Sequence, residues 1–563
     1  MTHKGSLVVL VLAAAMTWAG CGSRNAGPVA ERGTTPLPGD ADGDGIPDDW
    51  ERNGVNLTYP DGSKHFLDLK ALNASAAHKD VIVWVDWMGD GTLVQDGKKV
   101  IHNHQPRDTS ITMVKNAFAN AKQFTDNPDG TTGINLIVLV SPTSVTHQDL
   151  LGSGDLRDGS VWTALATVRD QRMPAQLKGV AHYCLFAHDI AADGTSGISA
   201  DIGAYDFVVS LGEWQDHRGN ETEQAGTFMH ELGHNLGLRH GGMDDLNRKP
   251  NYLSIMNYFF QTDGLQTPTG ENIINYSTAA FPDLDEGNLD ETKPITSDAQ
   301  WANWGSAYFC PNDKEHSKPI SSIYGTAVLW DCDGKSGTGV KADPNGDDNQ
   351  SGSGLNVLRS QIDWPRLKFK YTTAPAGQRT GVNAPTELTL AGANATPLPP
   401  ARGLTALAQG TSVRLSWNPV GSSRVRGYEI VRTQADEPAL VFTTTDLTYV
   451  DQLAKPAPTV RYDVRTLYVP HGASELLRPT GEKTDGFDLL TVGKAQRMVA
   501  VMMADKTAAV KLRQSYTADM DTLTQMLTSA GKQPAALSQM KSDLQGIQTL
   551  LASPAATVEV KLQ

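Results

Sequence analysis

The sequence predicts a multidomain protein with an α/β unit built on a mixed sheet, an all-β sandwich and a C-terminal α-helical hairpin. Three observations predict this organisation. Apolar β-branched runs alternate with helical spacing from residue 79 to about 240, and short alternating strands follow over 397–482. Apolar residues then recur at spacings of three and four over 487–563. A length of 563 residues suits several domains, and 39% hydrophobic content suits packed cores.

The charge balance favours cations as partners. Acidic residues exceed basic residues by 63 − 48 = 15, which gives a formal net charge of −15. Because a nucleic-acid partner requires a basic face, we expect no nucleic acid to bind.

The N-terminus resembles an export signal. Lys4 supplies a positive charge, and an apolar core over 7–16 is too short to span a bilayer. The run TWAGCGS resembles a bacterial lipobox, so we expect residues 1–21 to be a lipoprotein-type signal peptide with Cys21 as the lipidated residue. Ordinary secretory cleavage is the alternative. The protein is therefore expected at the bacterial outer membrane or cell surface, held by a lipid anchor alone, or outside the cell, with 22–39 as a flexible tether.

A calcium-binding loop is predicted over residues 40–51, DADGDGIPDDWE. The twelve positions carry oxygen donors in the register of a calcium loop, with Gly45 at the sharp turn. The expected calcium ligands are Asp40, Asp42, Asp44, the carbonyl of Ile46, Asp48 and Glu51. Pro47 argues against a paired helix-loop-helix hand, and an acidic solvated turn is the alternative.

The α/β unit follows the loop. Apolar runs with β-branched residues predict strands, and one segment between the first two runs shows helical spacing. The predicted strands are 79–88, 133–140, 180–190 and 205–211, and the predicted helix is 109–122.

A second helix carries the most informative motif, MHELGHNLGLRHGG, over 229–242. Asn220 can cap this helix, with Glu223 in the reciprocal position three residues later. His230 and His234 then lie four apart on one helical face, the spacing needed for two ligands of one zinc ion. Glu231 is rotated by about 100° from His230, so it stands beside the metal as a general base.

The third predicted zinc ligand is His240. Gly237 can adopt the left-handed conformation that ends the helix and turns the chain back toward the metal. The pattern HExxH alone is common and can mark a helix with two surface histidines. The longer pattern HExxHxxGxxH is much rarer, because a glycine and a third histidine must also be correctly spaced.

The run SIMNY, 254–258, lies shortly after this motif and resembles the Met-turn of metzincin metalloproteases. The resemblance covers roughly residues 79–300, and we expect a metzincin domain over 79–371. It implies that Met256 lies beneath the zinc ligands and that Tyr258 can ligate the metal or stabilise the oxyanion, although in many metzincins this tyrosine is structural. Gly241 follows the third histidine, so no subfamily is assigned, and the resemblance is to bacterial lipoprotein metalloproteases.

The resemblance implies a zinc-dependent endopeptidase that hydrolyses peptide bonds in a protein or peptide substrate. A calcium-dependent surface binding or adhesion protein with a latent or inactive protease domain is the alternative. No cysteine lies between residues 22 and 183, so the cysteine-based latency of matrixins is not expected.

An acidic region over 259–371 extends the catalytic unit. Cys310 and Cys332 are a plausible disulfide in an exported protein, whereas Cys184 lies in an apolar run and is expected to be a buried thiol. A second calcium site or a solvated loop would use Asp331, Asp333, Asp343, Asn345 and Asp347.

A linker over 372–396 is expected to lead to the sandwich, which resembles a fibronectin type III domain over 397–482. Trp417, Tyr428 and Tyr462 are its expected core residues, with Tyr462 as the corner tyrosine. Two helices joined by GKQP are expected over 487–563.

Overall fold

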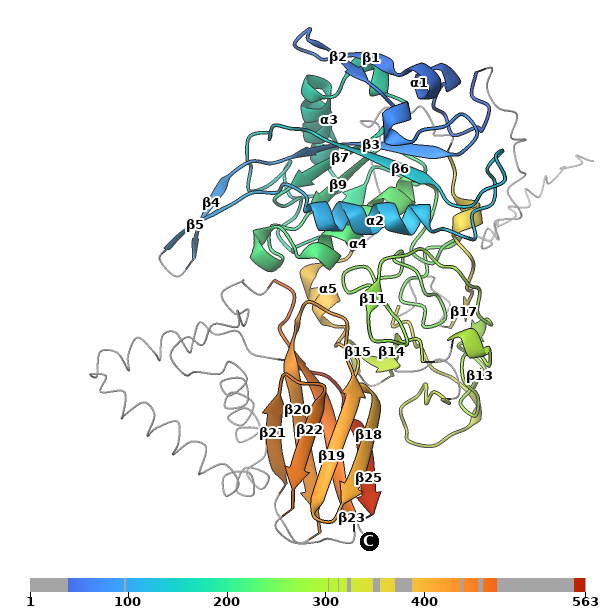
Figure 1. The fold of residues 1–563 in the computed structure, drawn as a ribbon, viewed down its shortest axis with the longest axis vertical. Helices are drawn as coiled ribbons and strands as arrows, with labels where there is room; N and C mark the ends of the chain where they lie inside the picture. The colour runs from blue at the N-terminus through green and yellow to red at the C-terminus, as the bar shows by residue number, and fades with distance from the viewer. Residues whose placement is uncertain are drawn as a thin grey trace, which may run out of the picture.

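The computed structural model places an α/β unit and a β-sandwich at opposite ends of the molecule, with an irregular region between them (Figure 1). The structure describes residues 39–95, 98–301, 303–311, 313–320, 326–347, 355–369, 387–435, 439–453, 459–472 and 551–561. The predicted signal peptide, Cys21, the tether up to residue 38 and most of the predicted helical hairpin lie outside these residues. Among the helices described, none has the length and apolar content needed to cross a membrane.

The α/β unit is built on a five-stranded mixed sheet with the strand order β6-β3-β7-β9-β8. The β3–β6, β3–β7 and β7–β9 pairs are parallel, and only β8 runs antiparallel, beside β9. The strands are β3 (Asp80–Trp87), β6 (Asn135–Val140), β7 (His182–Ala187), β8 (Gly197–Ser199) and β9 (Asp206–Ser210). The four predicted strands are therefore confirmed, with boundaries that differ by one to three residues.

Both faces of the sheet are covered, which explains why β3 is apolar without interruption from Val81 to Val85. Val83 and its neighbours of odd number pack against α2 (Asp108–Ala119) and α4 (Glu221–Asn235), whereas Ile82 and Trp84 pack against α3 (Ser160–Arg172). Figure 1 shows α2 and α4 on one side of the sheet and α3 on the other. The helix predicted over 109–122 corresponds to α2.

Two small hairpins flank the sheet. The N-terminal part contains α1 (Asp48–Asn53), β1 (Val55–Thr58) and β2 (Lys64–Leu67), and the second hairpin joins β4 (Gly91–Gln95) to β5 (Lys98–His102). The β4–β5 hairpin projects sideways from the α/β unit (Figure 1).

The irregular region after α4 is held together by short antiparallel pairs. These pairs are β10 (Leu265–Gln266) with β11 (Asn272–Ile273), β12 (Leu284–Asp285) with β17 (Val357–Leu358), β13 (Leu289–Asp290) with β16 (Thr338–Val340), and β14 (Ser306–Cys310) with β15 (Asp313–Ile320). A disulfide joins Cys310 and Cys332, and Cys184 is a free, buried cysteine.

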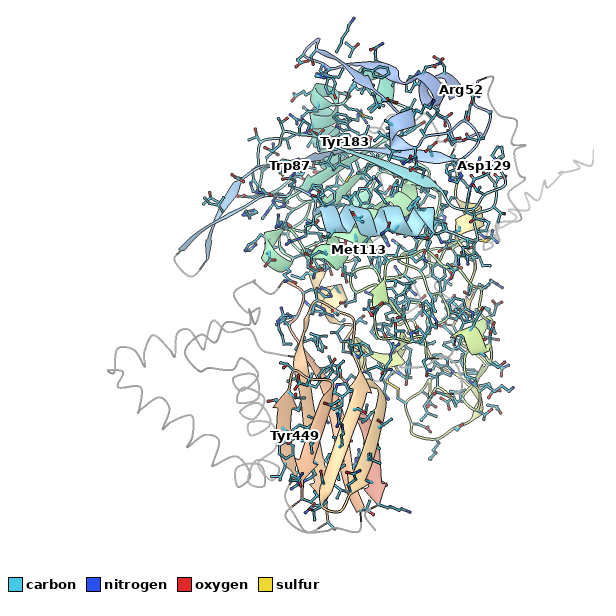
Figure 2. All side chains as sticks on the ribbon, in the orientation of Figure 1. Arg52, Trp87, Met113, Asp129, Tyr183 and Tyr449 are labelled. Atoms are coloured by element: carbon cyan, nitrogen blue, oxygen red, sulfur yellow. A yellow bond between two sulfur atoms is a disulfide. The ribbon has the colours of Figure 1, made fainter. Side chains whose placement is uncertain are left out.

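The sandwich packs two antiparallel sheets around one core. One sheet contains β18 (Arg402–Gln409), β19 (Ser412–Asn418) and β22 (Thr448–Gln452), and the other contains β20 (Val425–Gln434), β21 (Leu440–Thr444) and β23 (Thr459–Tyr468). Trp417, Tyr428 and Tyr462 are buried in the core, and the Tyr462 hydroxyl donates to Asp451 at 2.7 Å. Figure 2 labels one buried tyrosine of the α/β unit, Tyr183, and one tyrosine of the sandwich, Tyr449.

The prediction of a helical region over 487–563 is wrong for the part that the structure describes. Residues 551–561 contain β24 (Leu551–Ala552) and β25 (Ala556–Lys561), which pair with β23 and complete the second sheet. In Ala556–Lys561 the residues alternate between exposed and more buried positions, and Val560 enters the sandwich core. A strand with this alternation satisfies the hydrogen bonds along β23, whereas a helix would leave that edge unpaired.

The prediction of a linker over 372–396 is also wrong for its described part, residues 387–396. This part contains a short helix, α5 (Leu390–Asn394), whose first turn is capped by Thr389. Leu388 and Ala393 belong to the same buried core as α2 and α4. Apolar side chains at this spacing bury against the α/β unit, so the segment is part of the folded structure.

We expect Gly226→Ala to destabilise the protein, because the methyl group would lie 1.7 Å from the backbone oxygen of Gln261 on the packed face of α4. Overpacking against backbone should lower the free energy of unfolding by about 1–3 kcal/mol or more. The matched control is Gly392→Ala in α5, whose methyl group would meet only side-chain atoms at 3.3 Å or more. Equal melting temperatures for the two variants would contradict the close packing of α4.

Candidate active site

The N-terminus of α4 is fixed by a capping box, as the sequence predicts. The Asn220 side chain accepts from the backbone of Thr222 at 2.9 Å and of Glu223 at 3.0 Å. The Glu223 carboxylate in turn accepts from the backbone N–H of Asn220 at 2.8 Å. These bonds satisfy the free N–H groups of the first turn and set the rotation of the helix, so they determine where the side chains two turns later point.

Three buried histidines converge near the end of α4. The Nε2 atom of His234 lies 3.1 Å from that of His230 and 3.2 Å from that of His240. The Nδ1 atoms face outward, at 3.0 Å from the Ile255 carbonyl for His230 and 2.9 Å from the Leu238 carbonyl for His234. These carbonyls hold the protons on Nδ1 and leave the Nε2 lone pairs directed at one point, which is the arrangement of metal ligands.

The third histidine reaches this point because the chain reverses at Gly237. Gly237 has a φ of +95°, in the left-handed region that the sequence predicts for it. Its N–H donates to the carbonyl of His234, and the N–H of Leu238 donates to that of Gly233, so the last turn of α4 is closed.

Met256 lies directly against α4. A methyl group at Gly233, between the two helical histidines, would be 2.4 Å from the Met256 sulfur, so only glycine allows this contact. The turn that presents Met256 is rigid, since Asn257 donates to the carbonyls of Lys249 and Tyr252 at 2.8 Å each. Met256 therefore packs against α4 at Gly233, between His230 and His234 in sequence.

The Glu231 carboxylate is buried, and neither of its oxygens has a hydrogen-bond partner among the described residues. Burial, followed by the charge of Glu387, raises the pKa of Glu231 well above its ordinary value. A carboxylate that is free of partners and has an elevated proton affinity suits a general base. Gly197 makes room for it, because a methyl group there would meet Glu231 Oε1 at 2.9 Å.

Two further side chains enter the cluster. The Tyr258 hydroxyl lies 3.1 Å from His240 Nε2 and donates to Glu387 Oε2 at 3.2 Å. The same Glu387 oxygen lies 3.7 Å from His230 Nε2 and 3.5 Å from His240 Nε2. Glu387 thus forms a four-residue group of metal-ligating side chains with the three histidines, and all four are buried.

The protonation states suit a zinc ion. Burial lowers the pKa of His230 and of His234, so both imidazoles are neutral, which is the form that binds metal. Burial alone would raise the pKa of Glu387, but the neighbouring His230 and His240 hold it below its ordinary value. Three imidazoles and one carboxylate are a donor set that fits Zn²⁺.

The predicted calcium loop brings its carboxylates together with one from the sheet. Asp40, Asp42 and Asp44 form one group of close oxygens, and Asp44, Glu51 and Asp80 form another. Neither oxygen of the buried Glu51 carboxylate has a partner among the described residues. Burial first, and then neighbouring carboxylates, raise the pKa of Asp44 to about 8 and that of Glu51 to about 9. These buried carboxylates can all be ionised only with a positive charge among them.

Asp48 does not join these groups, although the sequence assigns it to calcium. It begins α1, accepts from the backbone of Ala41 at 2.7 Å and pairs with Arg52 at 3.0 Å. Ile46 donates its N–H to Asp44 at 2.7 Å and buries its side chain in the core. In this structure the Asp48 carboxylate is therefore held by the backbone of Ala41 and by Arg52.

The second calcium site stays a prediction. Among the described His, Cys, Asp and Glu side chains, no metal-sized group includes Asp331, Asp333, Asp343 or Asp347. Asp331 and Asp343 instead accept from nearby backbone N–H groups, and Asn345 donates to Asp347 at 3.2 Å. These are the contacts of acidic loops.

Comparison with known proteins links part of the chain to a metalloproteinase. No family model matches the sequence. Snake venom metalloproteinase TM-1 of Protobothrops mucrosquamatus is 40% identical over 85 residues, which are 15% of this chain and 41% of that protein. The chain thus spans less than half the length of this relative.

Two solved structures show only distant likeness. One, described as a myokine structure, is 16% identical and covers 14% of this chain and 92% of its own, with a TM-score of 0.12. The other, wild-type OgpA from Akkermansia muciniphila, is 10% identical and covers 70% of this chain and 91% of its own, with a TM-score of 0.16. At TM-scores this low, neither bears on the fold or the function.

Sequence reasoning missed Glu387 and Asp80. Glu387 lies in a segment that the composition marks as a linker, 147 residues after His240 (387 − 240). Asp80 begins β3, 36 residues after Asp44 (80 − 44), and no twelve-residue template extends that far. The local signal for Asp80 is a carboxylate directly before the apolar run from Val81 to Val85, and Asp86 at the end of the same strand shows that this signal is not specific.

Proposed function

We propose that this protein is a zinc-dependent endopeptidase of the metzincin type, exported to the cell surface or beyond. The observation that carries the proposal is the convergence of three Nε2 atoms, from His230, His234 and His240, beside the unpartnered Glu231 carboxylate. The similarity of 85 residues to a metalloproteinase supports the reaction class. Met256 packs against Gly233 as a Met-turn would.

His230, His234 and His240 would hold the zinc ion, which supplies a Lewis acid for the scissile carbonyl and for the attacking water. Glu231 accepts a proton as the water oxygen bonds to the carbonyl carbon, and it passes that proton to the amine nitrogen as the C–N bond breaks. Tyr258, whose hydroxyl lies in the same cluster, is placed to donate a hydrogen bond to the oxyanion.

Glu387 indicates that this conformation is latent. A catalytic zinc keeps one position open for water and substrate, whereas a zinc with four protein ligands is closed. Glu387 would occupy the fourth position, and the adjacent Leu388 and α5 are packed into the core formed by α2 and α4. We infer that residues 387–394 must move away before a peptide can be cleaved.

The alternative function, a calcium-dependent surface binding protein with a latent protease domain, is also favoured by Glu387. The fibronectin III-like sandwich would then be the binding module. The two hypotheses differ in whether any condition releases peptidase activity.

The direct test is to incubate the full chain with an unbiased peptide library, with and without a zinc chelator, and to identify products by mass spectrometry. We expect chelator-sensitive cleavage that is weak in the wild type and stronger in the Glu387→Ala variant described below, and the products would also reveal the subsite preference. No cleavage by the wild type or by the Glu387 variants below, with zinc bound, would reject the peptidase in favour of the binding protein.

We expect Glu231→Gln to abolish cleavage while zinc remains bound, because the amide keeps the size of the side chain but cannot accept the proton. General-base loss should lower kcat by about 10²–10⁴-fold or more. The measurement is single-peptide kinetics together with zinc content by mass spectrometry. A zinc-loaded variant with undiminished cleavage would disprove this role for Glu231.

We expect Glu387→Ala to increase cleavage and to weaken zinc binding, because it opens the fourth position and removes a ligand. An increase of at least tenfold in kcat/KM is expected, with a lower zinc affinity measured by competition with a chromogenic chelator. The matched control is Glu271→Ala, an exposed carboxylate that should change neither quantity. Loss of activity with unchanged zinc affinity would show that Glu387 is not an inhibitory ligand.

We further propose that Asp40, Asp42, Asp44, Glu51 and Asp80 bind calcium. The donors are all carboxylates, which Ca²⁺ prefers, and they join the loop after residue 39 to the first residue of β3. The ion would therefore tie the N-terminal segment to the sheet.

We expect calcium to raise the melting temperature of the wild type, with a gain of about 2.7 kcal/mol at a hundredfold excess over Kd. Asp80→Asn should weaken calcium binding at least tenfold by calorimetry, because it removes a buried charge from the group. The control is Asp49→Asn, which is exposed on α1. A melting temperature that is the same in calcium and in chelator would refute the site.

A further inference from the structure

A second cluster of buried histidines lies outside the active site. His102 ends β5, and His104 follows two residues later, before α2. His147 lies in the loop after β6, and His188 directly follows β7. The cluster is assembled from three segments that are far apart in sequence, at the carboxyl ends of parallel strands and at the base of the β4–β5 hairpin.

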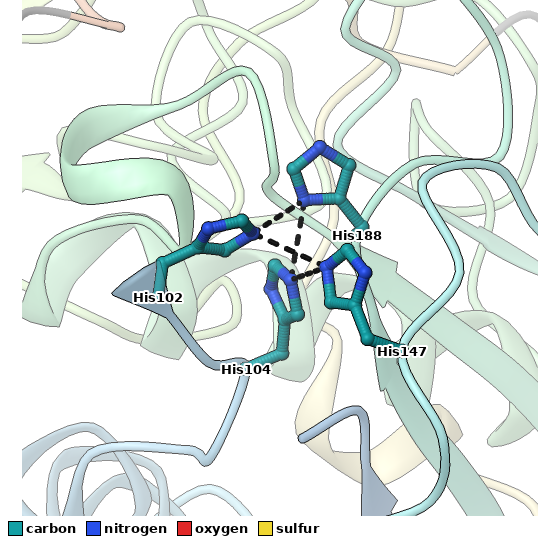
Figure 3. A group of neighbouring side chains, drawn as sticks. All are labelled: His102, His104, His147 and His188. Carbon is teal, nitrogen blue, oxygen red and sulfur yellow. Dashed lines mark hydrogen bonds between the residues drawn. The ribbon is translucent and has the colours of Figure 1, made fainter. Parts of the chain in front are cut away.

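One nitrogen from each ring points to a common centre (Figure 3). His188 Nδ1 lies 3.1 Å from His102 Nε2 and 3.2 Å from His104 Nε2. His147 Nε2 lies 3.2 Å from His102 Nε2 and 3.3 Å from His104 Nε2. Four ligand atoms held tetrahedrally about 2.0 Å from a metal ion lie about 3.3 Å apart, so these separations match a zinc–imidazole site.

The outer nitrogens of two rings face carboxylates. His147 Nδ1 lies 3.5 Å from Asp149, and His188 Nε2 lies 3.5 Å from Asp189. A carboxylate behind a ligating imidazole holds the proton on the outer nitrogen and directs the inner lone pair at the metal. Two of the four inner nitrogens are therefore acceptors that face the centre.

The backbone leaves space for this arrangement at two glycines. A methyl group at Gly91 would lie 2.3 Å from His147 Nε2, and one at Gly212 would lie 2.6 Å from His188 Nδ1. Both contacts are to the nitrogens that face the centre. Any larger side chain at either position would displace a ring from the cluster.

The cluster is buried and neutral. His102, His104 and His188 are buried. This burial is the main reason why the pKa of His102 and that of His188 are lowered to about 4. Four imidazoles so close together cannot carry protons on both nitrogens without strong repulsion. Hydrogen bonds between neutral rings would pair them two by two and do not require all four nitrogens to meet at one point, whereas a metal ion does.

We propose that His102, His104, His147 and His188 form a closed, structural site for a divalent transition metal, with zinc as the ion that tetrahedral imidazole ligands favour. Four protein ligands leave no position for substrate, so the site stabilises structure. The ion would fasten the β4–β5 hairpin to the edge of the sheet, where His104 also donates its N–H to the Met88 carbonyl at 3.0 Å.

The test counts zinc in the full chain after dialysis against zinc and then metal-free buffer. The wild type should retain two zinc ions, and His230→Ala/His234→Ala should retain one. Adding His102→Ala/His104→Ala to that variant should remove the remaining ion, whereas adding the exposed His65→Ala as a control should not. Retention of the last zinc after loss of both His102 and His104 would overturn the proposal.

A second measurement leaves all four histidines of this cluster in place. In His230→Ala/His234→Ala, zinc X-ray absorption should show four nitrogen neighbours at about 2.0 Å and no sulfur. Gly91→Ala in the same background should weaken zinc binding at least tenfold, because it displaces the His147 ring. A zinc shell made of oxygen alone, or no zinc bound to a folded chain, would reject the site. Both results are independent of peptidase activity.

Discussion

The close packing of α4 is the constraint on which the catalytic cluster depends. Its start is fixed by the capping box of Asn220, and its packed face has no side chain at Gly226 and Gly233, where the backbone of Gln261 and the sulfur of Met256 approach. A helix with both ends and one face fixed cannot rotate. His230, Glu231 and His234 therefore keep their directions without help from a bound ion, which is the preorganisation that a catalytic site needs.

The same helix connects the catalytic unit to the sandwich. Glu223 uses one carboxylate oxygen in the capping box and the other for His471, whose second nitrogen lies 3.2 Å from Asp263. Asp263 also pairs with Arg424 at 2.7 Å. Charged groups buried between two domains are satisfied only when the domains stay docked. The sandwich is thus a fixed support for the start of α4, although its sequence suggests an independent module.

What could be predicted from the sequence depended on distance along the chain. The zinc histidines, the capping box and Gly237 lie within twenty residues, so helical geometry alone relates them. Asp80, Glu387 and the cluster of His102, His147 and His188 join segments that only the sheet topology brings together. The runs IHNHQ, VTHQD and FAHDI each place a histidine near the end of a strand or hairpin, and parallel strands have their carboxyl ends on the same side of a sheet. The order of the strands cannot be read from the sequence, so these histidines cannot be grouped from the sequence alone. Val560 was assigned to a helical region because its pairing partner, β23, lies about a hundred residues earlier.

The two histidine clusters differ in which parts of the chain supply their four side chains. In the second cluster all four come from the sheet edge and its hairpin, so opening it would disrupt several strands at once. In the catalytic cluster three come from α4 and the turn after it, and the fourth comes from Glu387, at the start of a short segment that ends in α5. Leu388 and Ala393 of that segment are buried in the core formed by α2 and α4, so withdrawing Glu387 would require the segment to leave this core. The proposed latency would therefore be released by the movement of one short segment, whereas opening the second cluster would involve several strands of the sheet.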